Sequence, residues 1–262
     1  MVPRAPDRLW LIAVMVVMAG SPQLCAQGPI ATAQETSHTQ ATGSSGTTPA
    51  SESLLVARHL LDQGKVDDAI AALEDLARKA PNTPGLEAAL GKAYYQKRDF
   101  EKAALHLEIA LKEDPSDGET TQLLGLSYHL LNHVQQAIPL LEKVQSLIPH
   151  PDVTGSYLLG IDYLRSYQDG KARAAFARMF SVPPDTAQAH VVLAQMMIRE
   201  QFEDKAIPEL QKGLEIDPQV PMAHFLLGEM YLFKSQVEPA IAEFRKELAE
   251  NPVLWLAYWR MG

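Results

Sequence analysis

The histidines are the residues best suited to chemistry, because an imidazole can ligate a metal and can act as a general base near neutral pH. His129 and His133 are four residues apart, a spacing that brings two side chains to one face of a helix. His150, which stands between two prolines, could approach them from a loop. Since the pattern places no third ligand, we expect no metal site.

No catalytic signature is present in the sequence: there is no Gly-rich phosphate loop, no His-Glu-x-x-His and no Gly-x-Ser-x-Gly. The segment Asp114–Gly118 is similar to part of a calcium loop, but it lacks the later Glu and is better explained as a turn. Beyond Cys25, the sole cysteine, the chain has no thiol nucleophile, thiolate ligand or disulfide. We therefore expect neither an enzyme nor a cofactor.

The charge balance argues against a nucleic-acid partner. The chain has 262 residues with 23 basic and 32 acidic side chains, a formal net charge of -9. A surface that binds phosphates needs clustered Lys and Arg, so the class of nucleic-acid-binding proteins is disfavoured. Net charge does not choose among protein partners. The hydrophobic content of 47% is enough for a sizeable core.

The first 26 residues have the three-part plan of a secretory signal. Arg4 and Arg8 form a basic start, and an uncharged apolar run follows over residues 9–20. The run is well short of the roughly 20 residues that span a bilayer as a helix. We expect cleavage after Ala26 and export to a periplasmic or extracellular space.

Two alternatives to simple export stay open, a retained membrane anchor and a lipid on Cys25. In either case the link to a membrane would be through the leader alone. Residues 27–50 are mostly Thr, Ser, Gln, Ala and Gly, which is too little apolar surface to offset the entropy of ordering. We predict a disordered linker there, followed by a folded domain over residues 51–262.

Three residue types recur with one phase over six units, at spacings of 34, 34, 35, 34 and 34 residues. The prolines are Pro81, Pro115, Pro149, Pro184, Pro218 and Pro252. The alanines are Ala69, Ala103, Ala137, Ala172, Ala206 and Ala240. Small residues precede them at Ala57, Gly91, Gly125, Gly160, Ala194 and Gly228. Such a fixed period predicts an array of one supersecondary unit.

Each unit contains two stretches with helical apolar spacing, such as residues 86–97 and 100–113. The small residue and the alanine allow close approach between helices, and the recurrent proline ends the second helix. Three further prolines, Pro139, Pro208 and Pro239, fall early in the second stretch. We expect them in the first helical turn, where the backbone N–H groups have no helical partner.

This unit resembles the tetratricopeptide repeat, with Leu-Gly, Tyr, Ala, Leu or Phe, and Pro in order. The second unit matches at Leu90, Gly91, Tyr94, Ala103, Leu107, Ala110 and Pro115. The resemblance implies an all-α, right-handed superhelical solenoid of antiparallel helix pairs. Its units would be about 50–83, 84–117, 118–152, 153–186, 187–220 and 221–254, with a partial seventh unit at 255–262.

In this family the first helix of each pair lines a concave groove that binds proteins, so the resemblance implies groove residues on the first stretches. They are Arg58, Lys92, Tyr95, Gln122, Leu126, His129, Tyr157, Ile161, Val191, Gln195, Phe225 and Glu229. An apolar stripe with sparse polar groups suits an extended peptide or an amphipathic helix. The alternative is that some of these side chains pack within the solenoid.

The expected function is an exported scaffold that holds partner proteins in this groove. Because Gly262 falls 34 residues after Gly228, the last unit stops within a first helix. We expect an incomplete reading frame there, which motivates a second hypothesis: the docking portion of a larger enzyme. Uncovered Trp255 and Trp259 motivate a third, a structural protein that self-assembles into a homo-oligomer through its C-terminal aromatic helix.

Overall fold

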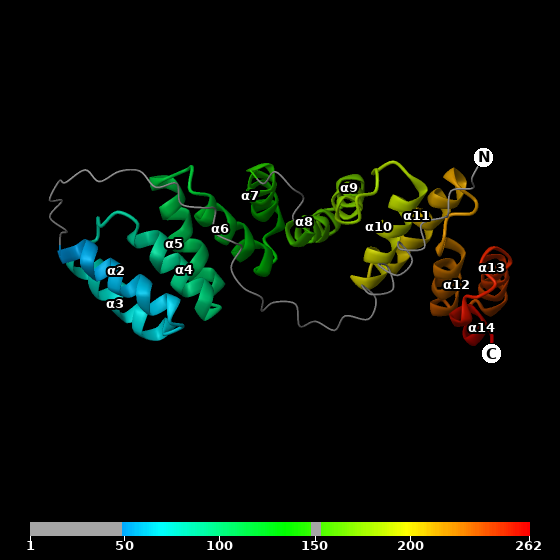
Figure 1. Cartoon of the computed structure of the whole chain (residues 1–262), viewed down its shortest axis with the longest axis horizontal. Helices are drawn as coiled ribbons and strands as arrows, with labels where there is room; N and C mark the ends of the chain where they lie inside the picture. Colours follow the sequence, from blue (N-terminus) through cyan, green and yellow to red (C-terminus); the bar gives the residue numbers. More distant parts are fainter. Residues whose placement is uncertain (1–48, 148–152) are drawn as a thin grey trace, which may run out of the picture. The chain divides into compact units, whose positions relative to one another are not determined.

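The computed structural model describes residues 49–147 and 153–262, which form thirteen α-helices and no strand (Figure 1). The helices are α2 (Pro49–Asp62), α3 (Val66–Lys79), α4 (Leu86–Lys97), α5 (Phe100–Glu113), α6 (Gly118–Leu130), α7 (Val134–Leu147), α8 (Val153–Arg165), α9 (Asp169–Met179), α10 (Ala187–Arg199), α11 (Glu203–Ile216), α12 (Ala223–Phe233), α13 (Val237–Glu250) and α14 (Trp255–Met261). None of them combines the length and hydropathy needed to cross a membrane. The leader and almost all of the linker lie outside the described residues.

The helices pack as successive pairs, each a first helix followed by a second. The pairs α2–α3, α4–α5, α6–α7, α8–α9, α10–α11 and α12–α13 form repeats one to six, and α14 opens a seventh. Each second helix also packs against the first helix of the next repeat. The protein is therefore an all-α helical-repeat solenoid, which confirms the predicted fold class.

The recurrent small residue lies where the two helices of a repeat come closest. A Cβ added to Gly91 would lie 2.5 Å from Cγ of Leu107, and one added to Gly160 would overlap the ring of Phe176. Leu107 and Phe176 have no exposed surface. The predicted role of this position, close approach of the paired helices, is confirmed.

A tyrosine joins each of three neighbouring repeat pairs. Tyr94 on α4 donates a hydrogen bond of 2.6 Å to Glu74 on α3. Tyr128 and Tyr163 donate in the same way to second-helix glutamates of the preceding repeats. The hydrogen bond to Glu74, with burial, raises the pKa of Tyr94 to about 12. These tyrosines are thus neutral donors that fix how one repeat stacks on the next.

The expectation for the early prolines is wrong in two cases. Pro139 and Pro208 lie inside α7 and α11, as the sixth residue of each helix. There the backbone N–H would ordinarily bond within the helix, so each proline removes one hydrogen bond. Pro239 is the third residue of α13, within its first turn as expected. Burial of the apolar face of α7 and α11 outweighs the lost bonds.

Candidate functional site

The twelve predicted groove residues fall into two groups by exposure. Eight are exposed or half-buried: Arg58, Lys92, Tyr95, Gln122, Leu126, His129, Tyr157 and Glu229. Four are buried: Ile161, Val191, Gln195 and Phe225. The accessible part of the predicted surface therefore lies mainly on the first helices of repeats one to four.

The buried members take part in packing inside repeats four to six. Val191 has no exposed surface, and the ring of Phe225 lies 5.6 Å from that of Phe244. Gln195 is 3% exposed, and its Nε2 has no hydrogen-bond partner in the described part of the chain. A partner could reach these side chains only after the helices moved apart, so the packing alternative describes their present position.

A cleft of about 240 Å³ lies across α2, α4 and α6. Two predicted groove residues, Arg58 and Lys92, line it. The remaining lining residues are Leu61, Asp62, Ala88, Ala89, Asp117, Glu119, Thr120 and Leu123. Drug-sized ligands need roughly 300–1,000 Å³, so this cleft suits one or two side chains of a protein partner rather than a small molecule.

The two cations of this cleft differ in their surroundings. Lys92 Nζ lies 2.7 Å from Oε1 of Glu119, which links α4 to α6. Both side chains are more than a third exposed, so the pair contributes little to stability. Arg58 is exposed and has no ion-pair partner among the residues described here. Its guanidinium is the charge in this cleft that a partner can use at least cost.

A second polar group joins α6 to α8. Nδ1 of His129 lies 2.8 Å from Oδ1 of Asp162 and donates to it, and Arg165 lies 3.8 Å from the same oxygen. Asp162 has no exposed surface, and its Oδ2 lacks a hydrogen-bond partner within residues 49–147 and 153–262. A buried carboxylate needs such partners, so Asp162 holds the His129 ring in one orientation.

Tyr157 makes the corresponding link from α8 to α10. Its hydroxyl donates a hydrogen bond of 2.9 Å to Glu200, and the guanidinium of Arg199 lies 5.6 Å from its ring centroid. Burial and the bond to Glu200 raise the pKa of Tyr157 to about 12. Tyr157 is therefore a neutral donor, unsuited to general base chemistry near neutral pH.

The polar links between first helices were not predicted. Arg260 on α14 pairs with Glu229 on α12 at 2.7 Å, so four of the predicted groove residues bind a neighbouring first helix. The partners of Lys92, His129 and Tyr157 lie 27, 33 and 43 residues further along. Because this separation varies, the repeat pattern carries no signal that could have identified them.

The two histidines that suggested a metal site have different environments. Nδ1 of His129 is engaged by Asp162, whereas the ring of His133 lies 6.0 Å from that of Tyr128. In the part of the chain that the structure describes, no three metal-ligating side chains gather at one point. His150 lies outside the described residues.

Comparison with known proteins gives a family and several relatives. The family model for the tetratricopeptide repeat matches residues 54–118 and 88–150. Aspartyl/asparaginyl beta-hydroxylase of Mus musculus is 27% identical over 171 residues, and the human enzyme is 27% identical over 176. Each match covers 60% of this chain but only 23% and 22% of the enzymes, so the chain spans less than a quarter of their length.

Several solved structures are similar in fold. A MamA structure, AMB-1, has 20% identity and a TM-score of 0.49, covering 68% of this chain and 97% of that one. MamA from Desulfovibrio magneticus RS-1 has 21% identity and a TM-score of 0.42, covering 78% and 96%. YrrB, described as a protein with an unusual peptide-binding site, has 19% identity and a TM-score of 0.41, covering 72% and 96%.

The family match and the helix pairs support the same conclusion. The matched residues span α2 to α7, and the same pairing continues through α13. The repeat spacing and the contacts of the recurrent glycine with the second helix agree with it. The chain is a tetratricopeptide-repeat protein.

Proposed function

We propose that this protein is an exported scaffold that binds a peptide or helix of a partner protein along its first helices. Tetratricopeptide-repeat proteins bind other proteins or peptides, so a role in protein–protein interaction follows from the family. The observation that carries the location is the cleft across α2, α4 and α6, with Arg58 unpaired among the described residues. Export rests on the leader in residues 1–26.

The binding surface can be tested by placing a photo-crosslinking amino acid at single positions in the full chain. Arg58 and Gln122 lie on first helices, and Lys112 is a matched exposed control on the second helix α5. We expect partner adducts from the two first-helix positions and none from Lys112. Equal adducts at all three positions, or adducts from Lys112 alone, would contradict the proposal.

Two charge-reversed variants refine this test. Arg58→Glu should weaken partner capture about tenfold or more, because it puts a carboxylate beside Asp62 and Glu119 in the cleft. Lys112→Glu changes the same charge on α5 and should leave capture unchanged. Circular dichroism is expected to show the same helical content for both variants.

Export can be tested separately by fractionating the cells of the source organism. We expect the mature protein outside the cytoplasm, with Gln27 as its N-terminal residue. A protein that keeps Met1 and stays with the cytoplasmic fraction would contradict export without affecting the proposed binding surface.

A docking role within a larger enzyme is a second candidate, favoured by the similarity to the two beta-hydroxylases. The similar region is a small part of those enzymes, so this chain would supply substrate docking rather than the reaction. Sequencing the gene beyond the codon for Gly262 tests it. A downstream catalytic domain would support the docking role, and a stop codon there would remove it.

Self-association is a third candidate, favoured by the exposed aromatic side chains of α14. Trp255 and Trp259 are 65% and 64% exposed, and Tyr258 beside them is 53% exposed. Such a patch favours burial against another surface. Sedimentation velocity over a range of concentrations should show dimers or larger species that Trp259→Glu abolishes. A monomer at all concentrations would exclude this candidate.

A further inference from the structure

Three repeats join their two helices through a buried histidine–glutamate pair. Nδ1 of His190 on α10 lies 2.7 Å from Oε2 of Glu209 on α11, and His224 and Glu243 are paired at 2.6 Å. The second repeat has the same pair with the residue types exchanged. In each case one member precedes the small residue by four positions, and the other follows the recurrent alanine by three.

The glutamate of this pair also binds a cation one turn further along the second helix. Lys212 Nζ lies 2.7 Å from Oε1 of Glu209, and Lys246 Nζ lies 2.7 Å from Oε1 of Glu243. In repeats five and six a single carboxylate therefore stands between a histidine on the first helix and a lysine on the second.

The fourth repeat keeps the cation but lacks the carboxylate. Ser156 stands at the histidine position, Ala175 at the glutamate position and Arg178 at the lysine position. Ser156 has no exposed surface, and its Oγ has no hydrogen-bond partner in the described part of the chain. Arg178 is exposed and makes no ion pair with any described residue. A buried hydroxyl without a partner is costly, so a ligand group is missing at this point.

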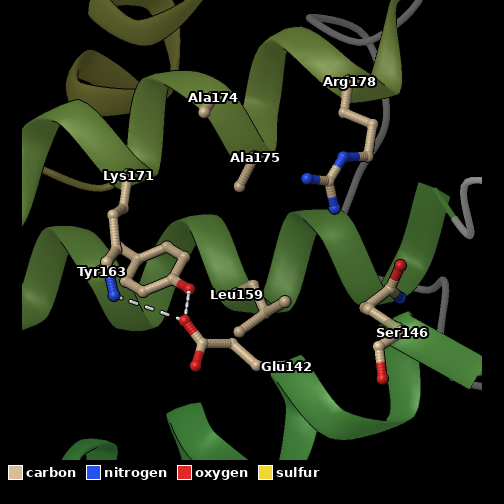
Figure 2. A pocket seen from close by; sticks show the side chains of 9 residues that line it. Glu142, Ser146, Leu159, Tyr163, Lys171, Ala174, Ala175 and Arg178 are labelled. Carbon is tan, nitrogen blue, oxygen red and sulfur yellow. Dashed lines mark hydrogen bonds and ion pairs between the residues drawn. The ribbon is translucent and has the colours of Figure 1, made fainter.

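The replacement of a large pair by Ser and Ala leaves an open space. A cleft of about 440 Å³ lies here, lined by α7, α8 and α9 (Figure 2). Figure 2 shows Arg178 extending from α9 above Leu159 and Ser146, with the methyl group of Ala175 beside it. The apolar part of the lining is Leu159, Ala174 and Ala175.

The second cation of the cleft is already engaged. Lys171 lies 3.4 Å from Glu142, which also accepts the hydroxyl of Tyr163. The ammonium group lies 5.2 Å from the centroid of the Tyr163 ring. This end of the cleft is thus neutralised, and the charge without a local counterpart is that of Arg178.

The first repeat shows what the same vacancy looks like without the cation. Ser53 and Ala72 occupy the pair positions there, and a cleft of about 460 Å³ contains both. Asp75 replaces the cation and is neutralised by Lys79 and Arg78, while Ser53 donates to the carbonyl oxygen of Pro49. The first repeat has therefore satisfied its polar groups, and the fourth has not.

We propose that the cleft between α7, α8 and α9 binds an acidic side chain, Asp or Glu, presented by a partner protein. The carboxylate would take the place that Glu209 and Glu243 occupy in repeats five and six, accepting hydrogen bonds from Arg178 and from Ser156. The apolar stem of that side chain would lie on Ala175 and Leu159. This second docking site goes beyond the first-helix surface, because it uses second helices.

The site can be tested by NMR titration of the isotope-labelled chain with two probes. One probe is N-acetyl-glutamate N-methylamide, and the other is its glutamine analogue, which has the same shape without the charge. We expect saturable shifts of the Ala175 methyl and Ser156 amide signals with the first probe, and binding at least about tenfold tighter than that of the second.

Variants of the cleft make the test specific. Arg178→Ala should weaken glutamate binding about tenfold or more, whereas Lys212→Ala, at the equivalent position of a filled repeat, should not change it. Ala175→Glu should abolish binding, since an internal carboxylate then fills the vacancy, and should raise the Tm relative to Ala175→Gln. The Tm comparison needs no ligand and so holds if the Arg178 variant is poorly folded.

Three results would overturn the proposal: equal binding of the two probes, binding that survives in both Arg178→Ala and Ala175→Glu, or a lower Tm for Ala175→Glu than for Ala175→Gln. Absence of any saturable shift with the glutamate probe would do the same. Because Arg58→Glu changes only the first-helix cleft, it should leave glutamate binding here intact. The two sites can thus fail independently.

Discussion

At the residue scale, the buried glutamates of the second helices connect the protein internally. Glu74, Glu108 and Glu142 accept tyrosines from the next repeat, and Glu209 and Glu243 accept histidines within their own. His190 and His224 were predicted as packing residues from their 34-residue recurrence, and their bonds to these carboxylates confirm it.

Glu209 is expected to make stability depend on pH. Burial opposes its ionisation, but hydrogen bonds from Lys212 and His190 outweigh burial and lower its pKa below 4.5. A folded pKa below the unfolded one stabilises the fold above the unfolded value, and this contribution is lost as pH falls through the folded value. Glu209→Gln should therefore cost about 1–3 kcal/mol at pH 7, and the difference should shrink in acid.

Urea unfolding at a series of pH values measures this difference. Glu238→Gln, at an exposed position in the first turn of α13, is a suitable control. A cost of Glu209→Gln that stays the same at pH 7 and well below pH 4.5 would show that the charge of Glu209 is not its cause.

At the element scale, the turn between the two helices of a repeat needs a left-handed residue. Gly64 fills this place in the first repeat with φ of 74°. In the next five repeats the same place is taken by a residue with a side chain and φ between 59° and 66°: Arg98, Asn132, Tyr167, Gln201 and Ser235. Each of these, asparagine least, carries a steric cost that glycine avoids.

Gln201→Gly should therefore stabilise the protein. The relief of strain exceeds the entropy that glycine adds to the unfolded chain, and we expect a gain of about 0.5–1 kcal/mol. Thermal unfolding measures it, and Gly64→Ala is the opposite change at the equivalent turn and should lower the Tm. A loss of stability with Gln201→Gly would mean that the Gln201 side chain contributes contacts that outweigh the strain.

At the scale of the whole molecule, packing is confined to neighbours along the chain. Each helix contacts the helices next to it, and α2–α4 and α4–α6 add contacts between first helices. Stability of such an array is approximately a sum of repeat terms and nearest-neighbour terms. The solenoid is therefore expected to unfold in parts as well as globally.

Phe176→Ala tests this local behaviour. Phe176 is fully buried against Gly160, so its truncation should cost about 3–5 kcal/mol within the fourth repeat. Hydrogen exchange measured by mass spectrometry should show lost protection in α8 and α9 and their neighbours, with α2 to α5 unchanged. Leu73→Ala in α3 should give the reverse pattern. Uniform loss from either substitution would indicate one cooperative unit instead.

The sequence by itself determined the repeat, its helix pairs and the residues that let paired helices meet. Those features depend on short-range spacing, which is visible along the chain: Gly160 and Phe176 are sixteen residues apart within one repeat. The sequence also placed Arg58 and Lys92 on an accessible surface, although it did not predict that Ile161, Val191, Gln195 and Phe225 are buried. The degree of burial depends on how closely successive repeats stack.

Only the tertiary structure decided which polar groups are paired. Asp162 reaches His129 across two repeats, and Arg178 is left without a counterpart because Ala175 replaces a glutamate. Hydrogen bonding and burial act between atoms a few ångströms apart, and no fixed sequence separation corresponds to that distance between repeats. The periodic pattern therefore specifies the scaffold, while its binding chemistry lies in the positions where one repeat departs from the others.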